Sequence, residues 1–521
     1  MKTDGNFRKI AKGGAVFTGG SIGATAIQFV TGLIVIRLLE RSDYGLISLG
    51  TTAVTILTVI SMLGFRTAVP RFLARHRAQG NKVIAGEVAG TALMCAVVLS
   101  SLFALMLYGQ ATLVAHMFDK PAVAPVFRML ALMLPAMVLI ETFSAIFQGM
   151  ENVRAKVIFQ DLTMNLMRLI LLLPVAIAGL GFQGVLWAYV STAWITLAIY
   201  LVYAIRNVRG VLHPQVSWAV TKDLLWFSFP LLGVSIMTNV VTWAATLTLG
   251  YLQPAEELGR FSAPLRLAAI LPVPLAGMTF LFLPVVSKLV ARDARQEILE
   301  LYRSTTKWAF IVTMPLLMYF VVDAEFMVTL LFGAAYHDSA NVLRILMIGF
   351  AINAFTGPNA SAIVAFGDTG TPFVLAMLAA GSAVLLCLLL VPQYGALGAA
   401  LGTAIAKSVS HVLMSVMLYR KFRIHALTAA FLKPVLFVAV VTALAGGLLH
   451  NVHVESPLLH LLLFLGVTAL TLSAPLVTRT LVKADLDLIG SIERRIWGKP
   501  RITRKLRRWV VDQPAGQGPE R

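Results

Sequence analysis

Residues 33–77 carry the pattern on which the rest of the chain is built, and they read LIVIRLLERSDYGLISLGTTAVTILTVISMLGFRTAVPRFLARHR. A short polar turn, from Glu40 to Tyr44, separates two apolar runs, and a segment with four arginines ends the stretch. Apolar runs of this length are typical of helices that cross a membrane, and basic residues gather on the cytoplasmic side of such helices. The stretch therefore predicts a membrane hairpin with one short polar turn and one positively charged end.

The composition extends this prediction to the whole chain. Of the 521 residues, 58% are hydrophobic and 13% are charged, and the mean hydropathy is +0.83. Soluble domains have about 45–50% apolar and about 25% charged residues. The sequence therefore predicts an all-α polytopic membrane protein.

Apolar runs and charge together predict about fourteen transmembrane helices with both termini in the cytoplasm. Of the 43 Lys and Arg residues, 34 fall in the N-terminus, every second loop and the C-terminal tail, whereas seven fall in the remaining loops and two within spans. This asymmetry follows the positive-inside rule, and an even number of spans agrees with it. The predicted spans are 13–36, 46–65, 86–109, 125–149, 156–178, 183–204, 224–249, 262–286, 308–332, 342–366, 372–392, 396–419, 431–450 and 457–478.

Two related halves are indicated by residues that recur at a constant offset of 214. Gly45 recurs as Gly259, Pro70 as Pro284, and the pair Gly181 and Gly184 as Gly395 and Gly398. Six crossings separate Gly45 from Gly259, so we expect parallel repeats around an axis along the membrane normal and a central cavity between two six-helix lobes. The predicted domains are an N-terminal lobe (1–210), a C-terminal lobe (211–425), two additional helices (426–480) and a basic cytoplasmic tail (481–521).

Polar side chains form stripes within the predicted spans, and the stripes follow the same repeat. One helix face carries Ser21, Thr25 and Gln28, and the offset places Ser235, Asn239 and Thr242 on the equivalent face of the seventh span. In the second and eighth spans, Ser48 corresponds to Ser262 and Thr52 to Arg266. Such side chains commonly satisfy neighbouring helices, but duplication favours a water-filled cavity between the lobes.

Charged residues within the spans are further candidates for a functional site. Arg168 and Lys407 are predicted either to line the cavity or to pair with an acid, which for Arg168 is Glu141 or Asp161. Glu141, Asp161 and Asp323 are candidates for ion coupling. His411 is predicted to be a packed or interfacial histidine.

Several classes of function lack their sequence signals here. The chain has no G-x-x-x-x-G-K-[ST] phosphate-binding loop, no metal-ligand spacing and no large outer loop with carboxylates, so we expect no enzyme, cofactor, metal or catalytic residue. Cys95 and Cys387 lie in apolar runs and are expected to be buried small hydrophobes. The tail at 479–521 alternates basic and apolar residues, which predicts binding to anionic lipid and not to nucleic acid.

Four segments resemble the multidrug/oligosaccharidyl-lipid/polysaccharide exporter superfamily. These are LLFGAAYHDSANVLRIL (330–346) and VPQYGALGAALGTAIA (391–406), with IRLLERSDYGLISLG (36–50) and FQGMENVRAKVIFQDLTMNLMRL (147–169) similar to its polysaccharide-flippase branch. The resemblance covers roughly residues 10–425. Fourteen spans also match the lipid II flippase family, whose last two helices form a lipid groove and whose cavity is lined by several arginines. Only Arg266 falls on a stripe shared by both halves here, so that likeness is partial.

The resemblance implies a plasma-membrane flippase for an oligosaccharide linked to a polyprenyl phosphate or diphosphate, working by alternating access in cell-surface glycan assembly. A sugar-diphosphate head crosses hydrocarbon only at a large cost, which a wet cavity removes. Cationic Arg168, Arg266 and Lys407 would offset the phosphate charge. Other polysaccharide-assembly proteins are expected partners.

Alternatives stay open at this point. A H⁺- or Na⁺-coupled multidrug exporter of the same superfamily would use Glu141 or Asp161. A membrane polysaccharide polymerase or glycosyltransferase would need the large outer loop that the chain lacks, and a scaffold has no use for duplicated polar stripes. Transport driven by the membrane potential and transport coupled to an ion both fit the sequence.

Overall fold

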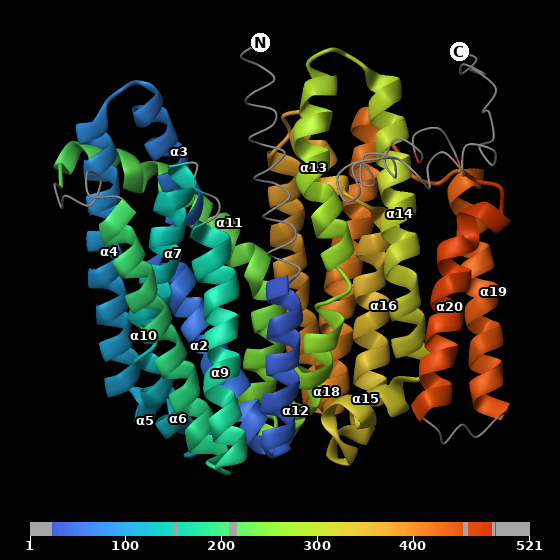
Figure 1. Cartoon of the computed structure of the whole chain (residues 1–521), viewed down its shortest axis with the longest axis horizontal. Coiled ribbons are helices and arrows are strands. Elements are labelled where there is room, and N and C mark those ends of the chain that lie inside the picture. Colours follow the sequence, from blue (N-terminus) through green and yellow to red (C-terminus); the bar gives the residue numbers. More distant parts are fainter. Residues whose placement is uncertain are drawn as a thin grey trace. The chain divides into compact units, whose positions relative to one another are not determined.

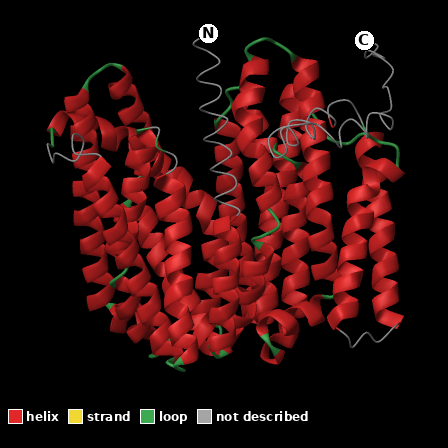
Figure 2. Ribbon diagram, in the orientation of Figure 1, coloured by secondary structure: helices red, strands yellow, loops and turns green. Residues whose placement is uncertain are grey.

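The computed structural model describes residues 23–150, 152, 155–207, 216–451, 457–481 and 485. The described part consists of helices joined by loops, without a strand (Figure 2). This confirms the predicted all-α class. It also follows from the composition, because every backbone N–H and C=O within a bilayer needs a partner and a helix supplies one internally.

The helices follow in a simple order along the chain (Figure 1). An unlabelled helix, Gly23–Leu38, comes first. The others are α2 (Arg41–Ser61), α3 (Phe65–Ala78), α4 (Lys82–Gly109), α5 (Ala111–Met117), α6 (Val123–Ala131), α7 (Leu134–Gly149), the π-helix η1 (Lys156–Thr163), α9 (Met164–Ile177), α10 (Gly181–Asn207), α11 (Trp218–Leu252), α12 (Ala255–Ala268), α13 (Val273–Val290), α14 (Arg295–Val322), α15 (Ala324–Phe332), the 3₁₀-helix η2 (Ala334–Ser339), α16 (Ala340–Thr356), α17 (Asn359–Ala365), α18 (Gly370–Phe422), α19 (Ala429–Asn451) and α20 (Pro457–Val477).

Ten of the described helical segments are long and apolar enough to cross a membrane, and eleven when the bent pair α6–α7 is taken as one span. The number is lower than the predicted fourteen for structural reasons. Helix α18 is 53 residues long and contains two predicted spans, the predicted span 262–286 is divided between α12 and α13, and 13–36 lies partly outside the described residues. A multi-pass membrane protein is confirmed, and fourteen crossings stay a prediction.

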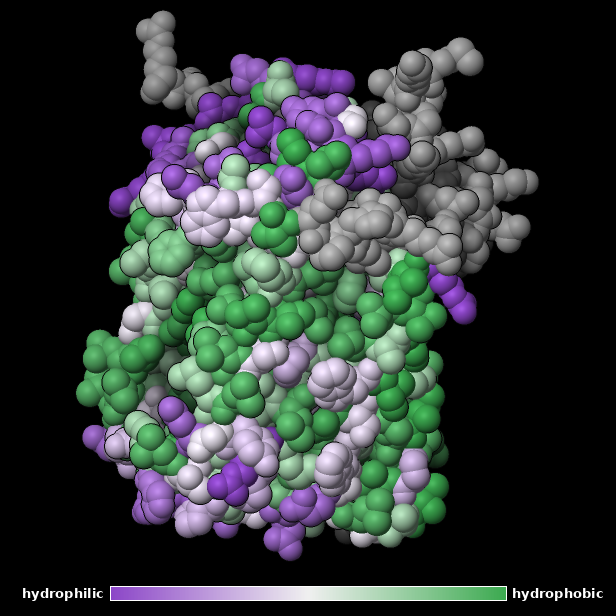
Figure 3. All heavy atoms as spheres, turned by 90° about the vertical axis from the view of Figure 1, so that its left-hand side faces the viewer, coloured by the Kyte–Doolittle hydropathy of each residue, from purple (hydrophilic) through white to green (hydrophobic). Residues whose placement is uncertain are grey.

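Figure 3 shows how side chains on one face of the molecule match this environment. Hydrophobic residues cover the middle of the face, with hydrophilic residues above it and in patches below. On α4, the side chains of Val98, Leu102 and Leu105 are exposed, and Leu105 is 72% accessible. Exposure of this kind is costly in water but suits contact with lipid chains.

Contacts divide the chain into two compact units. Unit 1 contains residues 1–266, 328–342 and 376–406, and unit 2 contains 267–327, 343–375 and 407–521. Because this grouping rests on contacts, helices α12, α15, α16 and α18 each contribute to both units. The predicted domains rest instead on the sequence repeat, and they stay a prediction.

Within unit 1, the repeat brings its own equivalent positions into contact. A Cβ atom at Gly45 of α2 would lie 2.9 Å from the backbone N of Gly259 and would overlap the carbonyl O of Ala255. One turn further along, the Oγ atoms of Ser48 and Ser262 are 2.8 Å apart. The helices can cross this closely only because glycine lacks a side chain at the crossing.

Gly181 and Gly395 give the repeat a second structural counterpart. Gly181 begins α10 with a φ of 56°, and Gly395 interrupts α18 with a φ of 53°, so both adopt the left-handed region that suits glycine. The predicted spans 372–392 and 396–419 meet at this interruption. The offset therefore marks two positions where a positive φ, and not only the residue type, recurs.

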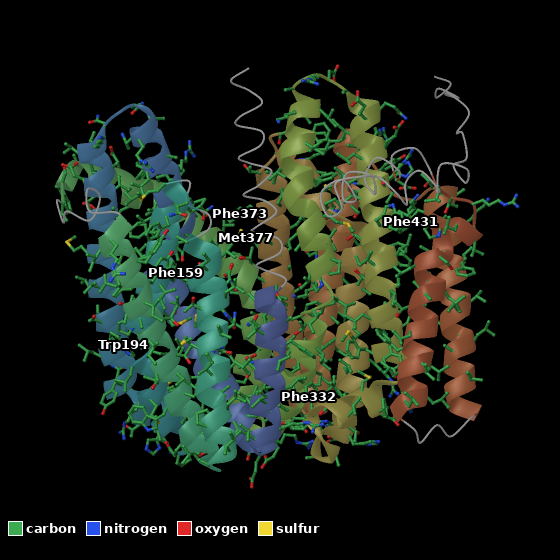
Figure 4. The ribbon with its side chains drawn as sticks, in the orientation of Figure 1. Phe159, Trp194, Phe332, Phe373, Met377 and Phe431 are labelled. Carbon is green, nitrogen blue, oxygen red and sulfur yellow. The ribbon has the colours of Figure 1, made fainter. Side chains whose placement is uncertain are left out.

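Unit 2 is centred on α14. The helix pair α19–α20 packs against α14 (Figure 1). Phe310 and Met314 of α14 lie in a core cluster with Phe431 and Val438 of α19 and Val467 of α20. Phe431 is labelled near one end of α19 in Figure 4.

Candidate functional site

Two arginines from distant helices meet around two buried tyrosines in unit 1. The guanidinium carbon of Arg168, on α9, lies 4.5 Å from the centroid of the Tyr189 ring, on α10. Arg266, near the end of α12, interacts with the phenol groups of both Tyr44 and Tyr189. The two tyrosines are only 3% and 4% exposed. We call these four residues the arginine–tyrosine cluster.

The cluster is held close to the first described helix. A Cβ atom at Gly32 would overlap the guanidinium of Arg266, so this arginine occupies the space that a side chain at Gly32 would need. Arg168 and Arg266 are close enough to repel each other electrostatically. Holding two like charges together costs free energy unless an anion lies between or beside them.

Neither arginine has a carboxylate partner among the described residues. The Nε atom of Arg168 is buried and makes no hydrogen bond. A guanidinium presents several N–H donors in a planar fork that matches phosphate oxygens. Chemically, the cluster can bind an anion such as a phosphate.

The acids proposed as partners for Arg168 are bound elsewhere, so that alternative was wrong. Glu141 pairs with Arg66 at 3.2 Å, and Asp161 lies in the field of Lys156 and Arg66. Asp161 belongs to η1, whose π geometry shifts its side chain relative to the i, i+4, i+7 face on which it was grouped with Arg168. These charges form a separate group in which the two acids face two cations.

The residues of the predicted polar stripes differ in exposure and in hydrogen-bond partners. Ser21 lies outside the described residues, Thr25 is half-buried and Gln28 is exposed. Ser235 donates to the carbonyl O of Leu231 and Asn239 to that of Ser235, so both turn back on their own helix. Thr52 likewise donates to the Ser48 carbonyl at 2.8 Å, and Thr242 is half-buried on α11. These residues stay candidates for a cavity wall, and Ser48 with Ser262 forms a helix contact.

Lys407 occupies a different environment, in unit 2. Its Nζ atom lies 4.0 Å from the centroid of the Phe350 ring, and no described carboxylate forms an ion pair with it. Nearby, Asn359 donates to the carbonyl O of His411 and to Ser415. His411 is partly exposed, and that it is a packed or interfacial histidine stays a prediction.

Asp323, the third candidate for ion coupling, lies just beyond the end of α14. Its Oδ2 atom is 2.5 Å from Nδ1 of His460 on α20. Burial raises the pKa of the Asp323 carboxyl, although the neighbouring imidazole opposes this shift. No group of three or more His, Cys, Asp and Glu side chains in the described part could hold a metal ion.

An apolar cavity of about 540 Å³ lies between α14, α16 and α19, entirely within unit 2. Thr442 is the one polar residue on its wall among the described residues. Apolar side chains of the three helices supply the rest, including Met314, Leu317, Ile348, Phe355 and Val438. A cavity with this lining suits a hydrocarbon chain and not a sugar or a phosphate.

Tyr44 and Tyr189 were missed by the sequence reasoning. Tyr189 begins a buried face of α10 that continues through Thr192 and Thr196, each 0% exposed, and this stripe was a usable signal. Tyr44 was read as part of a polar turn, whereas it belongs to the first turn of α2 and points inward. Asp338 pairs with Arg41 of α2 and Arg260 of α12, but no pattern in the neighbouring sequence pointed to this role.

The fold and the cluster define a class: a multi-pass helical membrane transporter built from two related halves with a cationic interior. Comparison with protein families is consistent with this class. The chain belongs to the polysaccharide biosynthesis protein family, whose model matches residues 34–341, within the multidrug/oligosaccharidyl-lipid/polysaccharide exporter superfamily. The lipid II flippase MurJ model matches residues 268–466.

Individual proteins and solved structures that resemble this chain share between 11% and 23% of its residues. A Shigella flexneri protein named "Putative O-antigen transporter" is 23% identical over 291 residues, which cover 54% of this chain and 66% of the relative. Lipid II flippase MurJ in an inward closed conformation has a TM-score of 0.68 and 11% identity, covering 88% of this chain and 98% of that one. An inward-facing multidrug resistance MATE family transporter has a TM-score of 0.66 and 16% identity, covering 77% and 94%. At these identities, the two structures show the fold alone.

Proposed function

We propose that this protein is a flippase that moves a lipid-linked oligosaccharide, carried on a polyprenyl phosphate or diphosphate, from the cytoplasmic to the outer leaflet of the plasma membrane for cell-surface glycan assembly. The observation that carries the proposal is the arginine–tyrosine cluster, where Arg168 and Arg266 lie together without a carboxylate partner among the described residues. The names of the relatives, a lipid II flippase and an O-antigen transporter, point to the same class of substrate.

The chemistry of each unit fits one part of such a substrate. In unit 1, Arg168 and Arg266 would bind the phosphate, and the half-buried Thr25, Ser235, Asn239 and Thr242 would contact the sugars. In unit 2, the apolar cavity would accept part of the hydrocarbon chain. Lys407, also in unit 2, stays a candidate for contact with the substrate.

The orientation follows from the charge asymmetry, with both termini in the cytoplasm. With the inside negative, each exported negative charge gains about 2.3 kcal/mol per 100 mV. We therefore propose that the membrane potential contributes to export, with Glu141, Asp161 and Asp323 as the candidates for ion coupling. Anionic lipid at the basic tail and other polysaccharide-assembly proteins are the proposed partners.

Reconstituted flipping tests the role of the two arginines. Fluorescent polyprenyl-diphosphate oligosaccharides in proteoliposomes would be followed for the wild type, Arg168→Ala, Arg266→Ala and Lys407→Ala, with and without an imposed potential. Since hydrogen bonds to charged groups contribute about 1.5–3 kcal/mol, each arginine variant should flip about ten- to a hundredfold more slowly. Arg420→Ala, at an exposed arginine, should flip like the wild type.

Unchanged flipping in both Arg168→Ala and Arg266→Ala would remove the cluster from the mechanism. Absence of flipping with several carriers, together with efflux of cationic dyes under a Na⁺ or H⁺ gradient, would favour the multidrug exporter. The two results are distinguishable because they concern substrates of opposite charge.

Alternating access requires that contacts at the outer end of unit 1 separate. Arg37 donates to the carbonyl O atoms of Leu330 and Leu331, the latter at 2.9 Å. Arg41 pairs with Asp338 at 2.5 Å, and Arg260 approaches the same carboxylate at 3.4 Å. Together with the crossing at Gly45 and Gly259, these contacts close the side that carries few basic residues in the sequence.

A reversible cross-link tests whether these contacts must separate. The Oγ atoms of Ser48 and Ser262 are 2.8 Å apart, so Ser48→Cys with Ser262→Cys should form a disulfide after small adjustments, in a background where Cys95 and Cys387 are replaced by serine. Oxidation should stop flipping and reduction should restore it. Either single cysteine variant should flip at the same rate with and without the oxidant. Undiminished flipping by the fully oxidised pair would exclude alternating access at this crossing.

A further inference from the structure

Two polar contacts join the C-terminal part of the chain to α14 and its end, one at Asp485, eight residues beyond the end of α20, and one at the beginning of α20. At the end next to the predicted cytoplasmic tail, Nζ of Lys307 pairs with the carboxylate of Asp485, and both side chains are nearly inaccessible. Ser304 and Trp308 donate to the other oxygen of the same carboxylate, at 2.8 and 2.9 Å. Lys307 and Asp323 are 16 positions apart on α14, so the second contact lies about 24 Å away.

That second contact is the pair formed by Asp323 and His460. The imidazole is 5% exposed and the carboxylate side chain 13%, and Nδ1 and Oδ2 are 2.5 Å apart. The Phe326 ring stacks on the imidazole, with the ring centroids 3.6 Å apart and the planes at 7°. The hydroxyl of Tyr319 donates to the backbone carbonyl of His460 at 3.0 Å. The beginning of α20 is thus held by side chains from α14 and α15.

The charge of this pair depends on one proton. With the imidazole protonated, the pair is neutral overall, and the aromatic face of Phe326 favours the cation. Without that proton, a poorly exposed carboxylate keeps its negative charge, which is costly away from water. Arg344 and Glu325, the other charged groups here, bind each other at 3.3 Å and so offset one another. His453 and Glu455, between α19 and α20 in the sequence, lie outside the described residues.

The same contact borders the apolar cavity. Tyr319 and Met318 of α14 line a small space with Thr442 of α19 and Leu463 of α20. Met318 and Thr442 are also on the wall of the cavity of about 540 Å³. Loosening the beginning of α20 would therefore change the packing beside that cavity.

We propose that Asp323 and His460 form a proton-binding site at the outer end of unit 2, and that protonation fastens the beginning of α20 to α14 beside the apolar cavity. An imidazole ordinarily changes charge between pH 5 and 8, so the pH outside the cell is the signal that fits. The regulatory meaning rests on the proposed flippase function, because the cavity is then the place where the lipid chain is held or released. The proton site itself does not depend on that function.

Hydrogen exchange of the full chain in lipid nanodiscs tests the proposal. Peptides from residues 457–468 would be compared at pH 6 and pH 8, with exchange times scaled to the intrinsic chemical rates. In the wild type, the amide groups should be about tenfold better protected at pH 6 than at pH 8. Asp323→Asn and His460→Gln should each remove this difference.

Two controls make the result specific. Glu297→Gln changes an exposed carboxylate in the first turn of α14, at the opposite end of that helix from the pair, so it should keep the difference between pH 6 and pH 8. Peptides from residues 470–477 should be equally protected at both pH values in every folded variant, since they lie at the other end of α20, just before Thr480, whose backbone carbonyl accepts a hydrogen bond from Lys307. Should Asp323→Asn fail to fold, His460→Gln carries the test alone.

Equal protection at both pH values in the wild type would overturn the proposal, as would a difference that survives in Asp323→Asn and His460→Gln. Neither readout involves transport. A protein that shows the exchange difference but flips no lipid-linked oligosaccharide would contradict the proposed function and leave the proton site standing.

Discussion

Gly45 and Gly259 show how a single missing side chain decides a helix contact. At the crossing of α2 and α12, the backbone of each helix fills the space in which the other residue would carry a Cβ atom. Gly86 on α4 offers a contrast, because no atom lies within 4 Å of the position of its Cβ. Two glycines in helices can therefore have unrelated reasons for being glycine.

At the same scale, Gly45→Val should destabilise the protein and Gly86→Val should not. The valine at position 45 must push the α12 backbone away, and overpacking of this kind typically costs about 1–3 kcal/mol. Thermal unfolding in detergent would measure the loss as a lower Tm. A Tm for Gly45→Val no lower than that of Gly86→Val would show that the crossing is looser than the structure describes.

The arginine–tyrosine cluster was only partly predictable from the sequence. Its arginines were identifiable because a charge within an apolar run is rare, but their surroundings were not. Tyr44 and Tyr189 reach Arg266 from helices that are distant in the sequence. The expected pairing of Asp161 with Arg168 assumed a regular α-helix of 3.6 residues per turn. Asp161 instead lies in the π-helix η1, which turns its side chain away from that face.

At the scale of elements, α14 and the residue after it make two polar contacts with the C-terminal part of unit 2, at Asp485 and at His460 of α20. The lysine–aspartate pair is the more deeply buried of the two, with 4% and 0% of its side chains accessible. A second pair, Lys421 with Asp368, lies near the end of α18 and is much more exposed. Lys421 holds the pKa of the Asp368 carboxyl below its usual range, so its contribution to stability is present near neutral pH and is lost as the pH falls through the lowered pKa.

We expect Lys307→Met to destabilise unit 2 strongly, because it leaves the Asp485 carboxylate buried without its cation. Breaking a buried pair on one side costs about 3–5 kcal/mol, whereas replacing both partners by apolar residues is often close to neutral. Lys307→Met with Asp485→Leu should therefore recover much of the Tm lost in the single variant. Lys421→Met, in the exposed pair, should change the Tm little.

A double variant that is no more stable than Lys307→Met alone would contradict this account. It would mean that Ser304 and Trp308, which also donate to Asp485, contribute more than the charge pair.

For the whole molecule, the distribution of charge predicts which side faces the cytoplasm. Arg77 is exposed at the end of α3, in a strongly basic loop, and Glu256 is exposed in the first turn of α12, in a loop with few basic residues. Arg77→Cys should react with a membrane-impermeant maleimide only in inverted vesicles, and Glu256→Cys only in right-side-out vesicles, in a background without native cysteines. The opposite labelling pattern would reverse the orientation and, with it, the proposed direction of transport.

The sequence by itself determined the class of the molecule and much of its plan. Apolar runs of about 20 residues must become helices in a bilayer, and the offset of 214 residues located the Gly45–Gly259 crossing, the Ser48–Ser262 contact and the positive φ shared by Gly181 and Gly395. Segment similarity identified the superfamily. These features are local or repeat at a fixed interval, so a reader of one sequence can find them.

Only the tertiary structure decided which charges meet. The partner of a charged side chain depends on helix rotation, and one residue of π-helical geometry or one inward-turned tyrosine changes it. Glu141 joined Arg66, Arg168 joined Tyr189, and Asp323 joined His460 across 137 positions. The apolar cavity likewise depends on how α14, α16 and α19 pack. Uniformly apolar helices carry no periodic signal for such a space, because in a membrane every face of a helix is allowed to be hydrophobic.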